Sequence, residues 1–363
     1  MDLSFMYETI LLITWKEAVM WLIGAILIYL AIKKDMEPTL LLPMGFGAIM
    51  VNIPGVSTGA LETLFEAGIA TELFPLILFI GIGAMIDFGP LLSNPKLMIF
   101  GAAAQFGIFF TLCLASMFFE LKDAASIAVI GAADGPTSIV VAQALDSNYV
   151  GAIMVAAYSY MALVPIIQPP VIKLLTTKKE RKIKMEYTEK SVSKITKILF
   201  PIVIFFVAAV VAPDSAELIG FLMFGNLIRE CGVLNSLSET AQKVLANLVT
   251  IFLGITIALK MQAELFLVPE TLLILLLGLV AFIVDTAGGV LFAKFLNIFL
   301  KKKINPMIGA AGISAFPMSG RVVHKLGLEA DPQNFLLMHS IGVNVSGQIA
   351  SVIAGGMILS FFG

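Results

Sequence analysis

Residues 130–138 read Ile130-Gly131-Ala132-Ala133-Asp134-Gly135-Pro136-Thr137-Ser138, and they place one carboxylate between two apolar segments. A carboxylate at the centre of a membrane helix costs roughly 2.5–3.5 kcal/mol on insertion scales. Gly135-Pro136 interrupts a helix here, and the break frees backbone carbonyls that bind hard cations alongside a carboxylate. The stretch therefore predicts a Na⁺ or H⁺ site at Asp134. An ordinary helix N-cap is the alternative, because Asp before Gly-Pro is also common turn chemistry.

The composition on both sides of this stretch indicates an integral membrane protein. Hydrophobic residues make up 59% of the chain and charged residues 13%, against roughly 25% charged residues in a soluble domain. Because a bilayer offers no partners to the backbone, long apolar runs must be helices, and we expect an all-α, polytopic membrane fold. Runs suited to the ~30 Å hydrocarbon core occur at about 18–32, 75–91, 97–119, 149–175, 198–212, 245–260, 271–299 and 334–362.

Basic clusters predict the orientation of these spans. Lys33-Lys34 close the first span, a second cluster occupies 178–197, and a third is Lys301-Lys302-Lys303. The positive-inside rule places all three clusters in the cytoplasm, opposite the cation-poor loops around 120–123 and 213–217. The first span therefore runs from outside to inside, and the first span after the second cluster runs from inside to outside.

Two short motifs recur at a fixed offset of 178 residues. Phe46-Gly47 falls on Phe224-Gly225, and the Ile-Gly-Ala-Ala of 130–133 falls on the same four residues at 308–311. Chance similarity is the alternative, since Gly-Ala-Ala is common in membrane helices. The motifs predict an internal repeat with interrupted or re-entrant segments.

The predicted domains follow from this repeat. Residues 1–175 form a first membrane repeat, 176–197 a cytoplasmic basic linker, and 198–363 a second repeat of opposite orientation. Inverted repeats of this kind are typical of transporters, whose sites lie at the repeat interface on interrupted helices.

The second interrupted segment, residues 305–321, contains three glycines and two prolines. Asn305 and Ser314 offer neutral oxygens for a cation. Arg321 carries a bidentate fork suited to a carboxylate, but an interfacial arginine that reaches toward lipid headgroups is an equal alternative.

Polar residues in other apolar runs leave alternatives open. Asn344 and its neighbours in the last span could bind a cation or join helices through hydrogen bonds; these neighbours are Ser346, Gln348 and Ser351. Tyr158 and Tyr160 could relay a proton or anchor an interface. Asp87 is read as a helix cap, and the role of Asp285 stays undecided.

Six longer motifs together resemble one family, the beta subunits of Na⁺-translocating biotin-dependent decarboxylases, which serve oxaloacetate, glutaconyl-CoA and methylmalonyl-CoA. The motifs cover most of the chain: EPTLLLPMGFGAIMVNIP (37–54), GAMIDFGPLLSNPK (83–96), GAADGPTSIV (131–140), AAYSYMALVPIIQPP (156–170), KINPMIGAAGISAFPM (303–318) and LLMHSIGVNVSGQIAS (336–351).

The resemblance implies roles for individual residues. Catalytic roles fall on Arg321, Asp134 and Tyr160, and contact with carboxybiotin on Arg321 and Ser314. The implied Na⁺ ligands are Asp134, Asn305, Gly309, Ser314 and Asn344.

The resemblance also implies a function and partners. A carboxyltransferase alpha subunit would move CO₂ from the substrate to biotin on a carrier protein. This chain would decarboxylate that carboxybiotin, pump Na⁺ outward and consume a proton. We further expect a small single-span anchoring subunit, several copies of this chain in the complex, a bacterial plasma membrane, and no nucleic acid partner. A short first outside loop, about 55–74, favours the acyl-CoA branches of the family.

Two other functions compete with this one. A Na⁺- or H⁺-coupled secondary transporter of an organic anion would show the same inverted repeat and intramembrane acid. A non-catalytic membrane anchor would not require buried polar groups, whose insertion is costly.

Overall fold

The computed structural model describes residues 12–34, 38–186 and 192–363. Within these ranges all regular secondary structure is helical. Glu37 of the first motif and Lys190 of the basic linker lie outside the described residues, as do the first residues of the predicted first repeat. The first part of the chain contains α2 (Trp15–Lys34), α3 (Pro38–Val51), α4 (Gly59–Gly68), α5 (Leu73–Met85), α6 (Gly89–Ser93), α7 (Met98–Ala104), α8 (Phe106–Ala115), α9 (Leu121–Ala128), η2 (Val129–Ala132), α10 (Gly135–Ala144), α11 (Val150–Leu175) and α12 (Lys178–Arg181).

The second part also combines long and short helices. It contains α13 (Lys194–Val211), α14 (Ala216–Glu230), α15 (Asn235–Glu239), η4 (Thr240–Leu245), α16 (Ala246–Ile257), η5 (Ala258–Met261), α17 (Ala263–Phe266), α18 (Pro269–Phe299), η6 (Pro306–Gly312), α19 (Met318–Ala330) and α20 (Leu337–Phe362).

Seven helical segments are long and apolar enough to cross a membrane, and α4 with α5 forms an eighth that is bent by 64°. Every apolar run predicted from the sequence corresponds to one of these eight. The fold class is therefore confirmed as an all-α, polytopic membrane protein with interrupted segments. The seven segments other than this bent pair are Trp15–Lys33, Pro95–Ala115, Val150–Leu175, Lys194–Val211, Asn235–Met261, Pro269–Phe299 and Leu337–Phe362.

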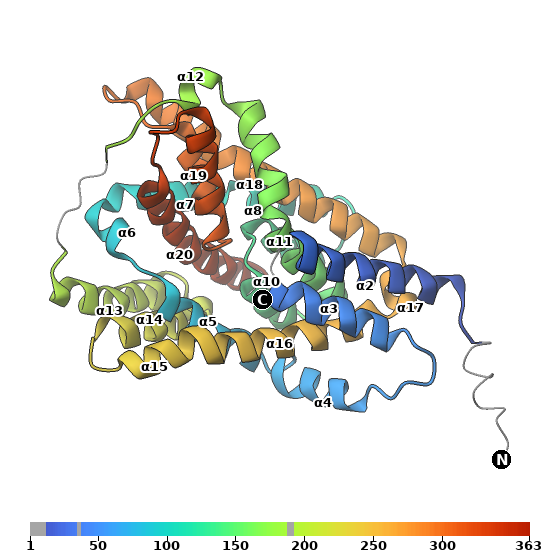
Figure 1. Ribbon diagram of the computed structural model, residues 1–363. Helices are drawn as coiled ribbons and strands as arrows, with labels where there is room; N and C mark the ends of the chain where they lie inside the picture. The colour runs from blue at the N-terminus through green and yellow to red at the C-terminus, as the bar shows by residue number, and fades with distance from the viewer. Residues whose placement is uncertain (1–11, 35–37, 187–191) are drawn as a thin grey trace, which may run out of the picture.

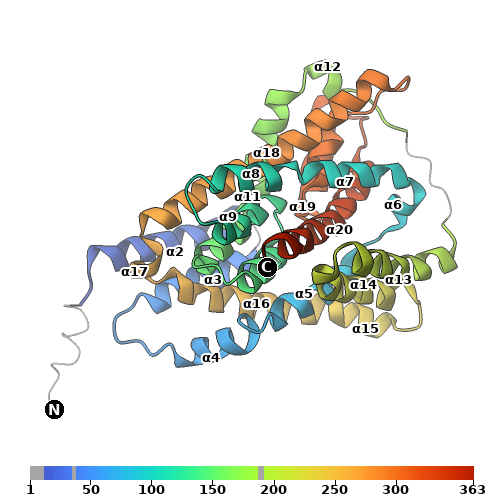
Figure 2. The same cartoon turned by 180° about the vertical axis from the view of Figure 1, so that it is seen from behind.

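Two helix hairpins lie at opposite ends of the molecule, α2 with α3 at one end and α13 with α14 at the other (Figures 1 and 2). Each hairpin packs on a helix from the other part of the chain, α3 on α16 and α14 on α5. Glycines permit the close approach. A Cβ on Gly47 would lie 2.6 Å from the Cβ of Ala258, and one on Gly225 would lie 2.0 Å from the carbonyl oxygen of Ile80.

These two close contacts are related by the offset of 178 residues, since Gly47 corresponds to Gly225 and Ile80 corresponds to Ala258. In each case an asparagine side chain also donates a hydrogen bond to a backbone carbonyl near the end of the partner helix. Asn52 Nδ2 donates to the Met261 carbonyl at 2.8 Å, and Asn226 Nδ2 donates to the Gly83 carbonyl at 3.3 Å. These reciprocal contacts support the predicted inverted repeat, which stays a prediction.

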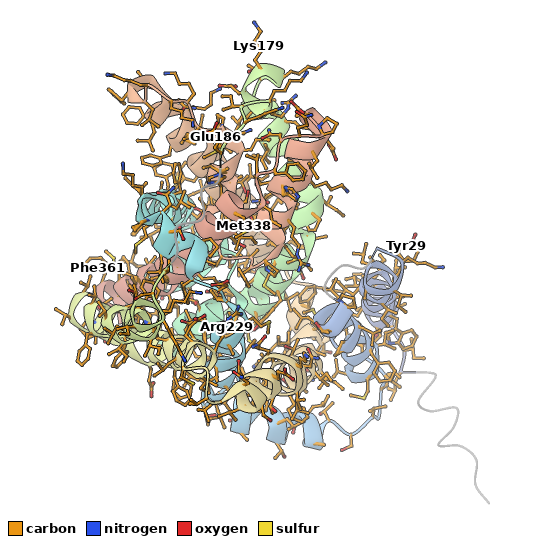
Figure 3. The ribbon with its side chains drawn as sticks, turned by 60° about the vertical axis from the view of Figure 1, so that its left-hand side comes forward. Tyr29, Lys179, Glu186, Arg229, Met338 and Phe361 are labelled. Carbon is orange, nitrogen blue, oxygen red and sulfur yellow. The ribbon has the colours of Figure 1, made fainter. Side chains whose placement is uncertain are left out.

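The second and third basic clusters lie together at one end of the molecule. Lys179 projects from α12 at the top of Figure 3, and Glu186 lies in the same region. The side chain of Glu186 pairs there with Lys302, with 2.7 Å between the ammonium and the carboxylate oxygen. Two of the three predicted cytoplasmic clusters therefore meet, as a common cytoplasmic face requires.

Candidate functional site

The backbone leaves the helical path at two successive residues, Ala133 and Asp134. η2 ends at Ala132, Ala133 has a left-handed φ of 54°, and Asp134 is extended before α10 begins at Gly135. Pro136 then lies in the first turn of α10, where the missing N–H has no helical partner to lose. The local sequence thus produces a break whose corner is the carboxylate.

The Asp134 carboxylate is 2% exposed and forms hydrogen bonds with neutral groups. Its Oδ2 accepts from Thr137 Oγ1 at 2.9 Å and from Ser351 Oγ at 3.0 Å. No lysine or arginine of the described residues forms an ion pair with it. A buried carboxylate without a cationic partner is costly unless it binds a proton or a cation, so this position suits either.

A cavity of about 260 Å³ borders Asp134. Both parts of the chain contribute to its wall. The first part supplies α3, α5, α10 and α11, and the second supplies α16, α20 and residues 314–317 of the second interrupted segment, which is called the second break below. Its polar lining residues besides Asp134 are Thr39, Tyr158, Asn247, Thr250, Ser314 and Gln348.

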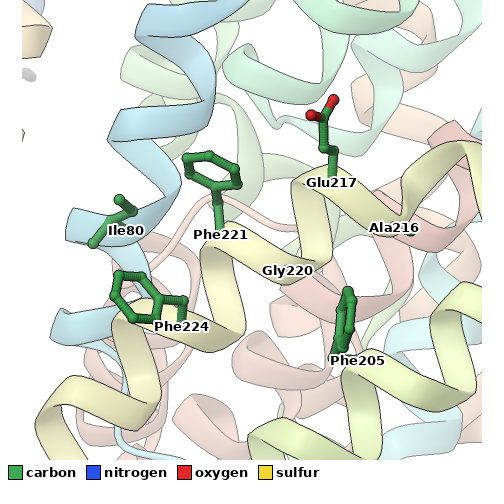
Figure 4. Close-up of a pocket in the computed structure, with 7 residues that line it drawn as sticks. All are labelled: Ile80, Phe205, Ala216, Glu217, Gly220, Phe221 and Phe224. Carbon is green, nitrogen blue, oxygen red and sulfur yellow. The ribbon is translucent and has the colours of Figure 1, made fainter.

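A larger hollow of about 460 Å³ lies elsewhere, between α5, α13 and α14. Figure 4 shows the rings of Phe205, Phe221 and Phe224 around it, with Glu217 at one end. Glu217 is the sole charged residue of its lining, whereas a cation needs several converging oxygens. The smaller cavity at Asp134 is therefore the candidate ion site.

The second break crosses the first one next to this cavity. Both the backbone N–H and the Oγ of Ser314 donate to the carbonyl oxygen of Ala132, each at 3.0 Å. The structure thus brings together the two interrupted segments that the sequence singled out. Behind them, Ala310 O accepts from Gln168 Nε2 of α11 at 2.7 Å and from Ser319 Oγ at 3.0 Å.

Helix α20 directs two side-chain amides at the second break. Asn344 Nδ2 donates to Ile313 O and Gln348 Nε2 donates to Ser314 O, both at 2.7 Å. A backbone carbonyl accepts only from the NH₂ end of an amide, so each side-chain oxygen is directed away from that bond. Neither oxygen has a hydrogen-bond partner among the described residues. Both are available to a hard cation.

Five of the residues implied by the resemblance do not line the cavity, and one of them, Asn344, lies one turn before Gln348 on α20. The other four are Asn305, Gly309, Tyr160 and Arg321. Asn305 uses its amide to hold the basic linker, donating to Arg181 O and Ile183 O at 2.9 Å while its oxygen accepts from Met307 N. Gly309 packs on α18, where a Cβ would lie 2.0 Å from Gly289 O. The Tyr160 hydroxyl donates to Leu275 O. Arg321 is exposed on α19, one turn beyond Pro317 of the cavity wall.

Three further residues belong to the site although the sequence left them open or favoured another. Tyr158 lies across Gly135, where a Cβ would be 2.4 Å from its ring, and it lines the cavity in place of Tyr160. Gln348 and Ser351 share one face of α20 with Asn344, at i, i+4 and i+7. That spacing is the sequence signal that could have selected them.

Comparisons with known proteins show the family of this chain. The family model described as "Na+-transporting oxaloacetate decarboxylase beta subunit" matches residues 16–362. The glutaconyl-CoA decarboxylase subunit beta of Acidaminococcus fermentans is 51% identical over 355 residues, which cover 96% of this chain and 94% of the relative.

Two other relatives are similar over comparable shares. The methylmalonyl-CoA decarboxylase subunit beta of Propionigenium modestum is 48% identical over 375 residues, 95% of this chain and 94% of the relative. The oxaloacetate decarboxylase beta chain of Klebsiella pneumoniae is 46% identical over 411 residues, 95% of each chain. An alignment longer than 363 residues contains insertions in the relative.

Proposed function

This chain belongs to the family of beta subunits of Na⁺-transporting decarboxylases, and from that premise we propose that it decarboxylates carboxybiotin and drives Na⁺ out of the cell. It is a multi-pass subunit of a decarboxylase complex in a bacterial plasma membrane. The observation that carries the proposal is the buried Asp134 carboxylate, which has two hydroxyl donors and borders a cavity.

In this proposal Na⁺ binds between the two breaks. Asp134 supplies the charge, and the free oxygens of Gln348 and Asn344 and the hydroxyl of Ser314 supply neutral ligands. Asn305 and Gly309 act indirectly, since their contacts hold the second break against the linker and α18.

Na⁺ enters this site from the cytoplasm. The cavity wall includes Thr39, which follows the first basic cluster closely, and Met85. The carbonyl of Met85 accepts from Arg229 Nη1 at 2.8 Å, and Arg229 forms an ion pair with Glu230 at 3.3 Å. The positive-inside rule assigns this charged end to the cytoplasm.

The reaction needs little covalent chemistry from the protein. The N–C bond of carboxybiotin breaks, CO₂ leaves, and the ureido nitrogen takes up one proton. Arg321, at the edge of the cavity wall, pairs with the carboxylate and orients it. Closure around carboxybiotin removes the water that stabilises this anion, which favours loss of CO₂.

The proton links chemistry to transport. It passes to the reaction through Asp134 or Tyr160 as Na⁺ leaves toward the outside. Each Na⁺ moved outward against about 100 mV costs about 2.3 kcal/mol, which the loss of CO₂ supplies.

The partners follow from the same reaction. A carboxyltransferase alpha subunit and a biotin carrier protein deliver carboxybiotin, a small single-span subunit anchors them, and several copies of this chain assemble. An acyl-CoA substrate is favoured, since the glutaconyl-CoA and methylmalonyl-CoA relatives align over 355 and 375 residues, whereas the oxaloacetate relative aligns over 411 and so contains longer insertions.

Asp134→Asn in the reconstituted complex tests the proposal. Loss of the charge should lower both Na⁺-dependent decarboxylation and Na⁺ uptake into inverted vesicles by about 100-fold or more, equivalent to about 2.7 kcal/mol. Glu186→Gln is the matched control, because that carboxylate is exposed at the surface and its loss should change neither rate. Persistence of both activities in Asp134→Asn near the wild-type rates would refute the proposal.

The same preparation separates the decarboxylase from a secondary transporter. The purified chain should release CO₂ from free carboxybiotin in a Na⁺-dependent manner. Transport of an organic anion without any such release would favour the transporter.

A further inference from the structure

Asp285 is a second intramembrane carboxylate, and the reaction proposed above does not use it. It lies at the centre of α18 and is completely buried. Its Oδ1 accepts the backbone N–H of Gly107, in the first turn of α8. Its Oδ2 has no hydrogen-bond partner in the part of the chain that the structure describes, and no ion pair in that part involves Asp285.

Two glycines make room for this carboxylate. Gly107 lies next to the break between α7 and α8, and a Cβ there would be 2.3 Å from Oδ1. Gly131 lies in η2, and a Cβ there would be 2.8 Å from Oδ2. The carboxylate therefore sits in a cradle formed by two interrupted segments, with its unpaired oxygen toward the segment that leads to Asp134.

Three more buried oxygens close to this cradle in the chain lack partners. Gln105 Oε1 lies at the α7–α8 break, Thr111 Oγ1 lies one turn after Gly107, and Thr286 Oγ1 follows Asp285 directly. Helix α18 packs along both α7 and α8. Carboxylate, amide and hydroxyl oxygens are the ligand types that a hard cation takes.

A bound cation explains this arrangement better than a proton. The N-terminus of α8 carries partial positive charge and stabilises an ionised carboxylate. A protonated Oδ2 would gain a donor that also needs an acceptor, and it would leave the other oxygens unpaired. We infer that Asp285 is the anionic ligand of a Na⁺ site separate from the Asp134 cavity, whose lining does not include it. The inference rests on the proposed function only for the identity of the ion.

Equilibrium binding of ²²Na⁺ to the purified complex tests this site. The wild type should bind one more Na⁺ per beta chain than Asp285→Asn does. An unchanged count in Asp285→Asn would overturn the inference, and this includes the case of a carboxyl that merely holds a proton. Asp134→Asn is measured in parallel, so that failure of the Asp134 site is seen independently of failure here.

A second pair of variants keeps the carboxylate and tests its cradle. Gly131→Ala places a methyl group against Oδ2, and the Na⁺ concentration for half-maximal binding at this site should rise about tenfold or more. Gly288→Ala is the control on α18, since its Cβ would find ordinary contacts of 3.4 Å or more. Equal Na⁺ affinity in both variants would contradict the assignment.

A measurement without any variant covers the case in which these proteins fail to fold. Tl⁺ soaked into the wild-type complex should give density beside Asp285 Oδ2. Density confined to other sites would overturn the inference.

Discussion

The first break, at 129–134, places a carboxylate beside a cavity. Residues 306–313 of the second break are buried among their neighbours, and only residues 314–317 of that break reach the cavity. At the position that corresponds to Asp134 by the 178-residue offset, the second break has Gly312. A Cβ there would lie 2.6 Å from Phe100 O and 2.7 Å from the Cβ of Ala104. The two positions that the predicted repeat relates therefore differ in charge, because only the first carries a carboxylate.

The two breaks also differ in the kind of neutral polar side chain that contacts them. The first break receives hydroxyls at its carboxylate, from Thr137 and Ser351, and the second break receives amides at its carbonyls, from Gln168, Asn344 and Gln348. The first break therefore carries the group that can bind an ion. The second break is fixed by three amides, and two of these, Asn344 and Gln348, keep side-chain oxygens without a partner among the described residues.

Exchanging the charge between the breaks should have the largest effect. The double variant Asp134→Gly/Gly312→Asp would force a carboxylate against the Phe100 carbonyl, where overpacking alone costs about 1–3 kcal/mol and an unpaired buried charge adds more. We expect a lower melting temperature in detergent and no Na⁺-dependent decarboxylation. A folded and active double variant would show that the two breaks are interchangeable.

A comparison of two glutamines gives the next effect. Gln348→Leu and Gln168→Leu each remove a hydrogen bond to a carbonyl of the second break, which costs roughly 1–3 kcal/mol of stability where the acceptor is left unpaired. Because only Gln348 borders the cavity, the half-saturating Na⁺ concentration should rise about tenfold in Gln348→Leu and stay near the wild-type value in Gln168→Leu. Equal shifts in the two variants would mean that Gln348 acts only as a structural tie.

The linker between the two predicted repeats should show the smallest effect. The hydrogen bond and charge of Lys302 lower the pKa of the exposed Glu186 below its ordinary value. A depressed folded-state pKa adds stability above the unfolded pKa, and this is lost as the pH falls through the folded value. Thermal melts of wild type and Glu186→Gln should coincide at high salt and differ slightly at neutral pH and low salt. A large difference would mean that this pair holds the linker in place.

The sequence predicted the spans and both breaks because hydropathy and Gly-Pro placement act locally. It also selected Asp134, since a carboxylate in an apolar run is conspicuous. It could not decide between Tyr158 and Tyr160, which lie about 200° apart around a helix of 3.6 residues per turn. Only the packing of α11 turns Tyr158 toward the cavity and Tyr160 toward Leu275.

Asn305 illustrates a different limit. Its residue type suits a cation as well as a loop, and the sequence does not reveal that the linker carbonyls of Arg181 and Ile183 occupy its amide. The spare oxygens of Asn344 and Gln348 likewise depend on which end of each amide faces the second break. Hydrogen bonds between distant segments decide both cases.

The contact from the Ser314 backbone N–H to the Ala132 carbonyl has a consequence for genetics. Both atoms belong to the main chain, so no replacement other than proline at residue 314 deletes the bond. A mutational scan of protein stability would record Ser314→Ala as mild, because the amide bond persists when the hydroxyl, a proposed Na⁺ ligand, is gone. The junction between the two breaks would then look dispensable in a tolerance map, although it joins residues 182 positions apart. An amide-to-ester substitution at residue 314, made by semisynthesis, is the change that would expose it.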